Sequence, residues 1–128
     1  MTRPADLADL ARLARLAHAA AEQRMGVLRR REDELRGTLA ELDAARRDRA
    51  AATAGQIDPA LQAGQDLRWH RWIDGRRQTL NAELARVLAG QAQVRAELAR
   101  DFGRKEAIES LRRDALAAQQ KARERRAF

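Results

Sequence analysis

The sequence predicts an all-α protein, a long two-helix antiparallel coiled-coil hairpin, and three observations support this prediction. The first is a column of apolar residues seven positions apart, namely Leu7, Ala14, Ala21, Leu28, Leu35 and Leu42. The second is a later column with the same period, namely Ile73, Leu80, Val87, Val94, Asp101, Ile108, Ala115 and Ala122. The third is one strong helix stop between the columns. A heptad period keeps two helices facing each other along a shared seam, so we expect each column to face the other helix.

The composition also favours long helices over a thick globular core. The chain has 128 residues, with two tryptophans, two phenylalanines and no tyrosine. Ala, Leu, Arg, Glu and Gln dominate, and these residues have high helix propensity. We therefore expect one helix to pack on another, with no strands.

The first helix is expected over about residues 4–52, with Pro4 in its first turn, where a missing N–H is tolerated. Its second seam position is expected three residues after the first, at Leu10, Ala17, Thr38 and Ala45, with Arg24 and Arg31 laying their stems across the seam. Leu13 and Leu16 continue a three-residue spacing of leucines that wraps more than one face. The first turns are therefore expected to contact something besides the second helix.

The turn is expected over about residues 53–58. Gly55 permits a chain reversal, Asp58 can cap a helix, and Pro59 suits the first helical position. We expect residues 1–128 to form a single hairpin domain.

The second helix is expected over about residues 59–125. Its second seam position falls at Leu84, Gln91, Leu98, Lys105 and Arg112, which become less apolar toward the C-terminus. The last turns are therefore expected to fray or to extend beyond the first helix. Glycines in this helix each cost about 1 kcal/mol relative to alanine, so it is expected to depend on pairing with the first helix.

Two tryptophans, Trp69 and Trp72, lie close together near the expected turn. Trp69 shares a helix face with Ile73 and Leu80, whereas Trp72 is offset from that face. Since a two-helix hairpin is too thin to bury both rings, we expect one to pack on the first helix and the other to be exposed. Exposed aromatics on thin scaffolds often anchor partners. We expect Trp69, Ile73 and Leu80, with Leu42 opposite, to form a partner contact. Trp69→Ala is expected to weaken that contact by about 2 kcal/mol or more and to affect hairpin stability less. The competing interpretation is that Trp69 belongs purely to the seam.

The net charge of +7 results from 26 basic and 19 acidic residues that are interleaved along the chain. Many charges fall at the spacing of pairs on one helix, including Glu32 with Arg36, Asp43 with Arg47, Asp101 with Lys105, and Glu109 with Arg113. Nucleic-acid binding would concentrate basic residues in one stripe. The mixed pattern therefore favours solvated helix surfaces and no nucleic-acid partner.

Catalytic, metal and cofactor sites are not expected. The chain has no cysteine, no phosphate-binding glycine motif and only isolated histidines, His18 and His70. The one serine, Ser110, has no histidine near it in sequence. Uncharged runs are at most eight residues long, far below the roughly 20 residues that span a bilayer. We therefore expect a soluble, cytoplasmic, non-enzymatic protein.

These features together resemble the flagellar export protein FliJ family and the related YscO-like stalk proteins. The residues that carry the resemblance are the two heptad helices, an Ala- and Arg-rich N-terminal arm, Trp69 near the start of the second helix, and the basic end Lys121–Arg126. The resemblance covers essentially the whole chain. It implies a fold similar to the coiled-coil part of the rotary ATP synthase gamma subunit. It also implies a location at the cytoplasmic side of the inner-membrane export apparatus, as a peripheral component of type III protein export.

The resemblance implies two partner surfaces. The contact for the cytoplasmic domain of the membrane export-gate protein maps onto Thr38, Leu42, Ala45, Arg49, Trp69, Trp72, Ile73, Arg76 and Leu80. The paired ends would enter the export ATPase hexamer, where arginines could meet acidic loops, namely Arg3, Arg12, Arg15, Arg113, Arg123, Arg125 and Arg126. Export chaperones are a further expected partner. The family's aromatics in the first ladder are replaced here by Ala45 and Arg49, and Arg76 stands where a small residue is usual.

Two other functions remain open on the sequence alone. A homodimeric coiled-coil scaffold or chaperone would use the same seams between chains. A basic helical nucleic-acid binder is favoured only by the positive net charge and clusters such as Arg29–Arg31, which Glu32, Asp33 and Glu34 follow directly.

Overall fold

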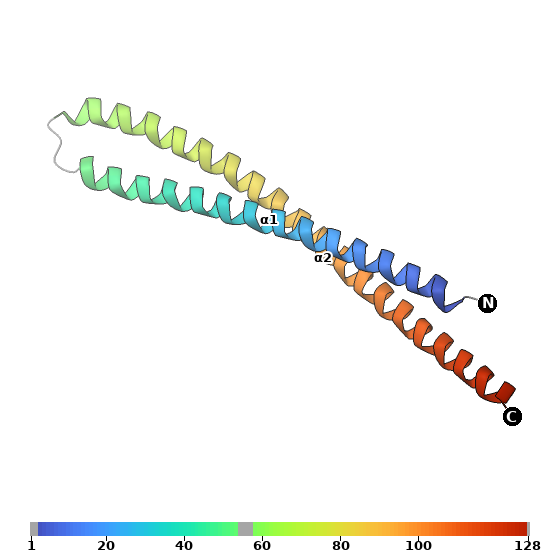
Figure 1. Cartoon of the computed structure of the whole chain (residues 1–128). Helices are drawn as coiled ribbons and strands as arrows, with labels where there is room; N and C mark the ends of the chain where they lie inside the picture. Colours follow the sequence, from blue (N-terminus) through green and yellow to red (C-terminus); the bar gives the residue numbers. More distant parts are fainter. Residues whose placement is uncertain (1–2, 54–57, 128) are drawn as a thin grey trace. The chain divides into compact units, whose positions relative to one another are not determined.

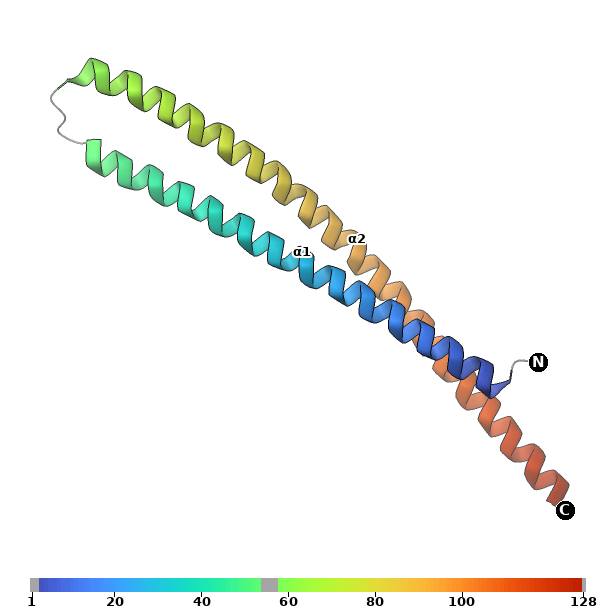
Figure 2. The same ribbon diagram turned by 45° about the horizontal axis from the view of Figure 1, so that its top comes forward.

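A computed structural model describes residues 3–53 and 58–127 (Figures 1 and 2). Helix α1 comprises Pro4–Thr53 and helix α2 comprises Pro59–Ala127, and the described residues contain no strand. The prediction of an all-α, antiparallel two-helix hairpin is confirmed. The reversal expected at Gly55 lies outside the described residues.

Each helix begins at a proline, and the carbonyl oxygen of the residue before that proline accepts a hydrogen bond from a backbone N–H in the first turn. The Leu61 N–H donates to Asp58 Oδ1 at 3.2 Å, and the Gln62 N–H donates to the Asp58 carbonyl oxygen at 3.0 Å. Asp58 is therefore the N-cap that the sequence predicts. At its other end α2 stays helical to Ala127, beyond the expected fraying point. Arg125 and Arg126 lie in this last turn, where positive charge interacts favourably with the helix dipole.

The packing divides into two units, each of which pairs a stretch of α1 with an antiparallel stretch of α2. Unit 1 comprises Met1–Gly26 with Ala92–Phe128, and unit 2 comprises Val27–Gln91. Unit 1 contains the start of α1 and the end of α2 (Figure 1). Each unit has its own buried residues.

The core of unit 2 is built from large aliphatic side chains. Leu35, Leu80, Leu84 and Val87 form one buried cluster, and Leu35 is only 1% exposed. Packed around this cluster are the half-buried leucines of α1, namely Leu28, Leu39 and Leu42. Both heptad columns therefore meet in this unit as predicted.

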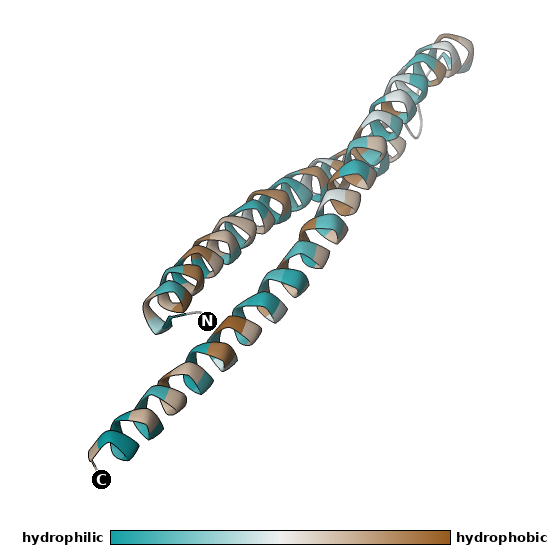
Figure 3. Ribbon diagram, turned by 90° about the vertical axis from the view of Figure 1, so that its right-hand side faces the viewer, coloured by the Kyte–Doolittle hydropathy of each residue, from teal (hydrophilic) through white to brown (hydrophobic). Residues whose placement is uncertain are grey.

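Unit 1 has a thinner core because alanine fills most of its α1 positions. Its buried residues are Leu7, Ala11, Ala14, Ala21 and Met25 from α1, and Val94 from α2. Beyond Val94 the seam residues of α2 are only half-buried. Figure 3 shows hydrophobic and hydrophilic residues alternating from turn to turn along both helices.

The second seam position of α1 differs from the prediction by one residue. Ala11 and Met25 are buried, whereas Leu10 and Ala17 are exposed. The step from the first column is therefore four residues rather than three. A seven-residue period allows either step, and the apolar Leu10 favoured the wrong one. On α2 the predicted positions are correct at Leu84 and Gln91, which are both buried.

Ion pairs across the seam replace several pairs expected within one helix. Glu32 and Arg36 do pair on α1, with Nε and Oε2 2.7 Å apart. Asp43, however, lies 3.3 Å from Arg77 on α2. In unit 1 Glu109 lies 3.7 Å from Arg15. Exposed pairs of this kind contribute about 0 to 1 kcal/mol each, so they influence register more than stability.

Candidate functional site

Trp69 is held against α1 by an arginine from that helix. The guanidinium carbon of Arg49 lies 4.8 Å from the centre of the Trp69 ring, and Arg49 Nε donates a hydrogen bond to Asp66 Oδ1 at 3.0 Å. Trp69 also makes an edge-on contact with His70, with ring centres 5.2 Å apart. Trp69 is therefore half-buried and fixed by a cation–π contact.

Trp72 has the opposite environment. Its side chain is 61% exposed. The expectation of one tryptophan packed on the first helix and one exposed is therefore confirmed. An exposed tryptophan presents a large rigid apolar surface, which is the usual property of an anchor residue at a protein interface.

The exposed face of α2 around Trp72 is positively charged. Arg68, Trp72 and Arg76 follow one another at four-residue spacing and share one face of the helix. All three are exposed, and neither arginine forms an ion pair within residues 3–53 and 58–127. We call these three residues the Trp72 face.

The acidic residues close to the Trp72 face pair with arginines of α1. Asp66 pairs with Arg49 at 3.0 Å, and Asp74 pairs with Arg46. Neither carboxylate pairs with Arg68 or Arg76, so within residues 3–53 and 58–127 no ion pair compensates the charge of the Trp72 face. Sequence reasoning identified Trp72 and Arg76 but missed Arg68. The four-residue spacing from Arg68 to Trp72 and Arg76 was the available signal.

The remaining residues predicted for the export-gate contact divide by burial. Ile73 is 1% and Leu80 is 4% exposed, and Leu42 packs on the Leu35 cluster. These three stabilise the hairpin, and a partner would reach Ile73 or Leu80 only if the helices separated. Thr38 and Ala45 are half-buried. The Thr38 hydroxyl donates to the Glu34 carbonyl oxygen at 3.0 Å. The surface open to a partner is therefore the Trp72 face, with Trp69 and Arg49 at its edge.

The arginines predicted to enter the ATPase ring all lie in unit 1 and are exposed. Those at the N-terminal end have acidic partners, because Arg3 lies 3.4 Å from Asp6, Arg12 pairs with Asp9 and Arg15 pairs with Glu109. The α2 arginines form no ion pair in the described part of the chain, namely Arg113, Arg123, Arg125 and Arg126. The end of α2 therefore offers the stronger positive surface for an acidic partner.

A polar layer interrupts the seam of unit 2 at Glu32 and Gln91. Gln91 is 5% exposed, and its Nε2 donates to Glu32 Oε1 at 2.8 Å. Arg36 Nε donates to the other oxygen of Glu32 at 2.7 Å. The hydrogen bond from Gln91, followed by that from Arg36, lowers the pKa of Glu32 below its ordinary value of 4.5.

Within 3–53 and 58–127 no group of three or more His, Cys, Asp or Glu side chains is placed to hold a metal ion. In the same ranges neither helix contains a stretch long and apolar enough to cross a membrane.

Comparisons of the chain with protein-family models, with curated proteins and with solved structures give no match. The resemblance to the FliJ family therefore stays a prediction.

Proposed function

We propose that this chain is a non-enzymatic stalk of the type III export apparatus, which couples the export ATPase ring to the membrane export gate. The single observation that carries the proposal is that uncompensated surface residues occur in both units. Unit 2 carries the Trp72 face, and unit 1 carries the arginines at the end of α2 that form no ion pair with any other described residue. A coupling protein needs two such surfaces, one for each partner. The proposed location is the cytoplasmic side of the inner membrane, and export chaperones are further proposed partners.

In this proposal unit 1 enters the ATPase ring. A stalk needs no active site, because an asymmetric rod that touches a ring of equivalent subunits favours different conformations in different subunits. The two helices of unit 1 differ in how far their arginines are paired with acids, and this difference provides the asymmetry. Arg3, Arg12 and Arg15 are paired with acids, whereas the α2 arginines Arg113, Arg123 and Arg125 have no acidic partner in the described ranges. Acidic loops in the ring would therefore bind the α2 side more strongly.

Unit 2 contacts the export gate through the Trp72 face. Trp72 provides the apolar anchor, and Arg68 and Arg76 flank it with positive charge. A central aromatic with charged neighbours is typical of an interface hot spot. The gate surface is therefore proposed to carry an apolar pocket bordered by carboxylates.

The ring contact is tested by charge reversal at the end of α2. We would replace Arg113, Arg123, Arg125 and Arg126 with Glu and measure binding to the purified export ATPase, together with stimulation of its ATP hydrolysis. The matched control reverses four exposed arginines of unit 2, namely Arg29, Arg30, Arg47 and Arg86. The first variant is expected to weaken binding at least about tenfold at low salt, and the control is expected to change it much less. Equal affinity of the two variants would contradict the placement of unit 1 in the ring.

A further inference from the structure

A row of three acidic residues runs along α1 in unit 2. Glu34, Glu41 and Asp48 are seven residues apart, so they share one face of the helix. Glu34 is bonded to Arg31, whereas Glu41 and Asp48 are exposed and form no ion pair within residues 3–53 and 58–127. We call these three residues the acidic row. Within the same ranges the acidic row has two carboxylates without an ion pair, and the Trp72 face has two such arginines.

The acidic row and the Trp72 face lie on the same flank of unit 2. Arg31 connects the two helices there, because its Nη1 donates to Glu34 Oε2 at 3.0 Å and its Nε donates to Glu83 Oε1 of α2 at 3.0 Å. Glu83 is seven residues after Arg76 and therefore has the same position in the heptad. The uncompensated charge of this flank is thus negative along α1 and positive along α2.

The two sides of this flank also differ in the size of their side chains. Trp72 projects from α2 and is 61% exposed. On α1 the residues beside the acidic row are small, namely Gly37, Ala44 and Ala45. Apart from nearby backbone of its own helix, no described heavy atom lies within 4 Å of the place that a Cβ on Gly37 would occupy. The α1 side therefore leaves room for a large aromatic ring, which buries about 150 to 250 Å² on such a surface.

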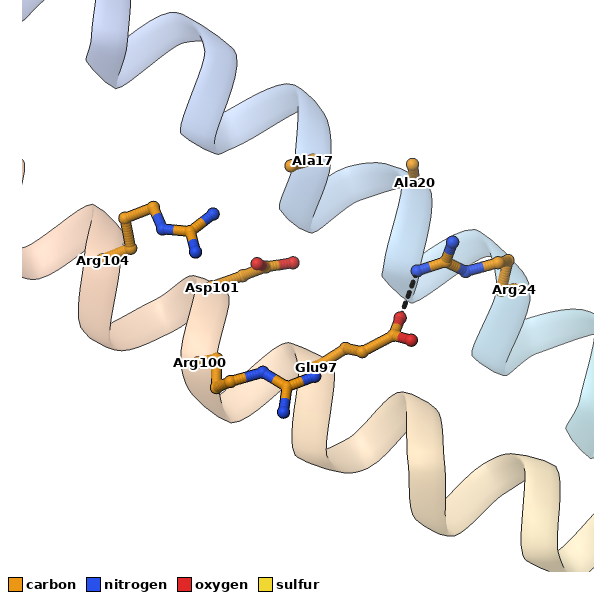
Figure 4. A pocket seen from close by; sticks show the side chains of 7 residues that line it. All are labelled: Ala17, Ala20, Arg24, Glu97, Arg100, Asp101 and Arg104. Atoms are coloured by element: carbon orange, nitrogen blue, oxygen red, sulfur yellow. Dashed lines mark hydrogen bonds and ion pairs between the residues drawn. The ribbon is translucent and has the colours of Figure 1, made fainter.

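A hollow of unit 1 lacks such a separation of charge. Figure 4 shows Arg100, Asp101 and Arg104 together on one stretch of α2. Across the hollow, Arg24 of α1 is bonded to Glu97. Opposite charges there alternate along one helix or are already paired, so they favour no particular partner. The flank of unit 2 is the surface whose charge pattern selects one.

A second copy of this chain matches the pattern by symmetry, because a two-fold contact uses the same patch on both copies. If the two hairpins lie antiparallel to each other, each helix meets its own counterpart and like charges meet, which is unfavourable. If they lie parallel, α1 of each copy meets α2 of the other and opposite charges meet. A different protein would need both sets of charges in the inverse arrangement. We propose that unit 2 forms a parallel two-fold dimer through this flank, with the acidic row of each copy on the Trp72 face of the other.

Asp48 lies close to the level of Arg68 along the hairpin. The guanidinium carbon of Arg49, the next residue of α1, is 4.8 Å from the centre of the Trp69 ring, and Trp69 follows Arg68 on α2. A two-fold axis parallel to the helices keeps each residue at its own level. Asp48 of one copy is therefore expected to meet Arg68 of the other.

Glu41 lies close to the level of Arg76. Asp43, two residues later on α1, is 3.3 Å from Arg77 of α2. Because the helices are antiparallel, Glu41 is level with a point two residues beyond Arg77, which is within one turn of Arg76. Glu41 and Arg76 of the two copies therefore form the second ion pair. Trp72 then lies on the small residues of α1 beside the acidic row.

Charge reversal on each side tests this contact. Glu41→Arg with Asp48→Arg makes both sides of the flank positive. Arg68→Glu with Arg76→Glu makes both sides negative. Analytical ultracentrifugation is expected to show a wild-type dimer that forms above about 50 μM and dissociates near about 1 μM, whereas each variant alone should stay monomeric. An equimolar mixture of the two variants should restore the dimer, because every contact then joins a positive side to a negative side.

The restored dimer also shows that both variants are folded. The control, Arg47→Glu with Arg71→Glu, changes exposed arginines of unit 2 that point about 100° away from Asp48 and Trp72. It alters the net charge as much as the second variant does and should dimerise as wild type. A wild-type chain that stays monomeric up to about 500 μM would overturn the proposal. A mixture that stays monomeric, or a dimer that either charge-reversal variant retains, would overturn it too.

The dimer is independent of the export proposal, because no export protein enters the test. One consequence does rest on that proposal: the dimer covers the Trp72 face, so a chain bound to the export gate would be a monomer. Failure of the dimer test would leave the proposed gate contact untouched.

Discussion

Gln91 of α2 donates a hydrogen bond to Glu32 of α1 across the seam of unit 2, with Nε2 and Oε1 2.8 Å apart. A polar pair at a seam position specifies register, because shifting one helix past the other would leave both side chains without their partner. The neighbouring cluster of Leu35, Leu80, Leu84 and Val87 is purely apolar and would tolerate more than one register. The leucines therefore contribute most of the stability, and the Glu32–Gln91 pair selects one alignment.

The first prediction concerns pH. The pKa of Glu32 is lowered in the folded chain, so its contribution to stability is fully present above its ordinary pKa and is lost as pH falls through the folded pKa. Wild type should therefore lose stability as the pH falls below the ordinary Glu32 pKa of 4.5, and Glu32→Gln should lose less over the same range. Urea denaturation at several pH values measures this difference. Glu41→Gln, which removes an exposed carboxylate that has no ion pair in the described residues, is the control and should behave as wild type.

The second prediction concerns the core of unit 2. Leu35→Ala should lower the free energy of unfolding by about 2 to 5 kcal/mol, because Leu35 is enclosed by residues of α2. Leu61→Ala should change it by less than about 0.5 kcal/mol, because Leu61 is exposed. Thermal melts followed by circular dichroism compare the two variants. Similar melting temperatures would contradict the assignment of Leu35 to the core.

The third prediction separates the two tryptophans. In Trp69→Phe only Trp72 remains to fluoresce, and in Trp72→Phe only Trp69 remains. Because Trp72 is exposed and Trp69 is covered by Arg49, acrylamide should quench the first variant more strongly than the second. Equal quenching constants would show that the Arg49–Trp69 contact does not persist in solution.

The fourth prediction concerns binding at the Trp72 face. Trp72→Ala should weaken binding of the export-gate cytoplasmic domain by about 2 kcal/mol or more and should leave the melting temperature nearly unchanged. Trp69→Ala should lower the melting temperature instead, because it removes a contact with α1. Calorimetric titration and thermal melts on both variants give these values. Unchanged gate binding by folded Trp72→Ala would remove the case for a recognition surface there.

The fifth prediction concerns the ion pair between Arg24 and Glu97 in unit 1. A double-mutant cycle with Arg24→Ala and Glu97→Ala should give a coupling free energy of about 0.2 to 1 kcal/mol at low salt. Raising the salt to about 1 M should remove most of it, because screening is then effective at a few ångströms. A coupling that does not depend on salt would indicate packing of the side-chain stems instead.

The buried faces of the two helices could be predicted from the sequence, because apolar residues at heptad spacing are the ones that become buried. Leu35 and Val87 were placed correctly in this way. The second column of α1 was misplaced because steps of three and four residues both satisfy a seven-residue period. The burial of Ala11 and Met25 and the exposure of Leu10 and Ala17 distinguish them. The sequence predicts the seven-residue period of a buried helix face more reliably than it predicts which residues of each heptad face the other helix.

The charged part of the surface was harder to predict, since ion pairs across the seam depend on the alignment of the helices. Asp43 was expected to pair with Arg47 on its own helix, yet it contacts Arg77 on α2. For the same reason the free positive charge beside Trp72 was not foreseen. This charge can be identified only once Asp66 and Asp74 are known to form ion pairs with α1.

The alanines in the seam of unit 1 have a consequence for local opening. Ala11, Ala14 and Ala21 bury much less apolar area than the leucines of unit 2, and burial stabilises by roughly 25 cal/mol per Å². Local openings of a protein occur first where few apolar contacts must be broken. Backbone amides of residues 7–21 should therefore exchange with deuterated solvent sooner than those of residues 28–42. Unit 1, which is proposed to enter the ATPase ring, would then be the unit whose conformation adapts more readily to the surrounding subunits.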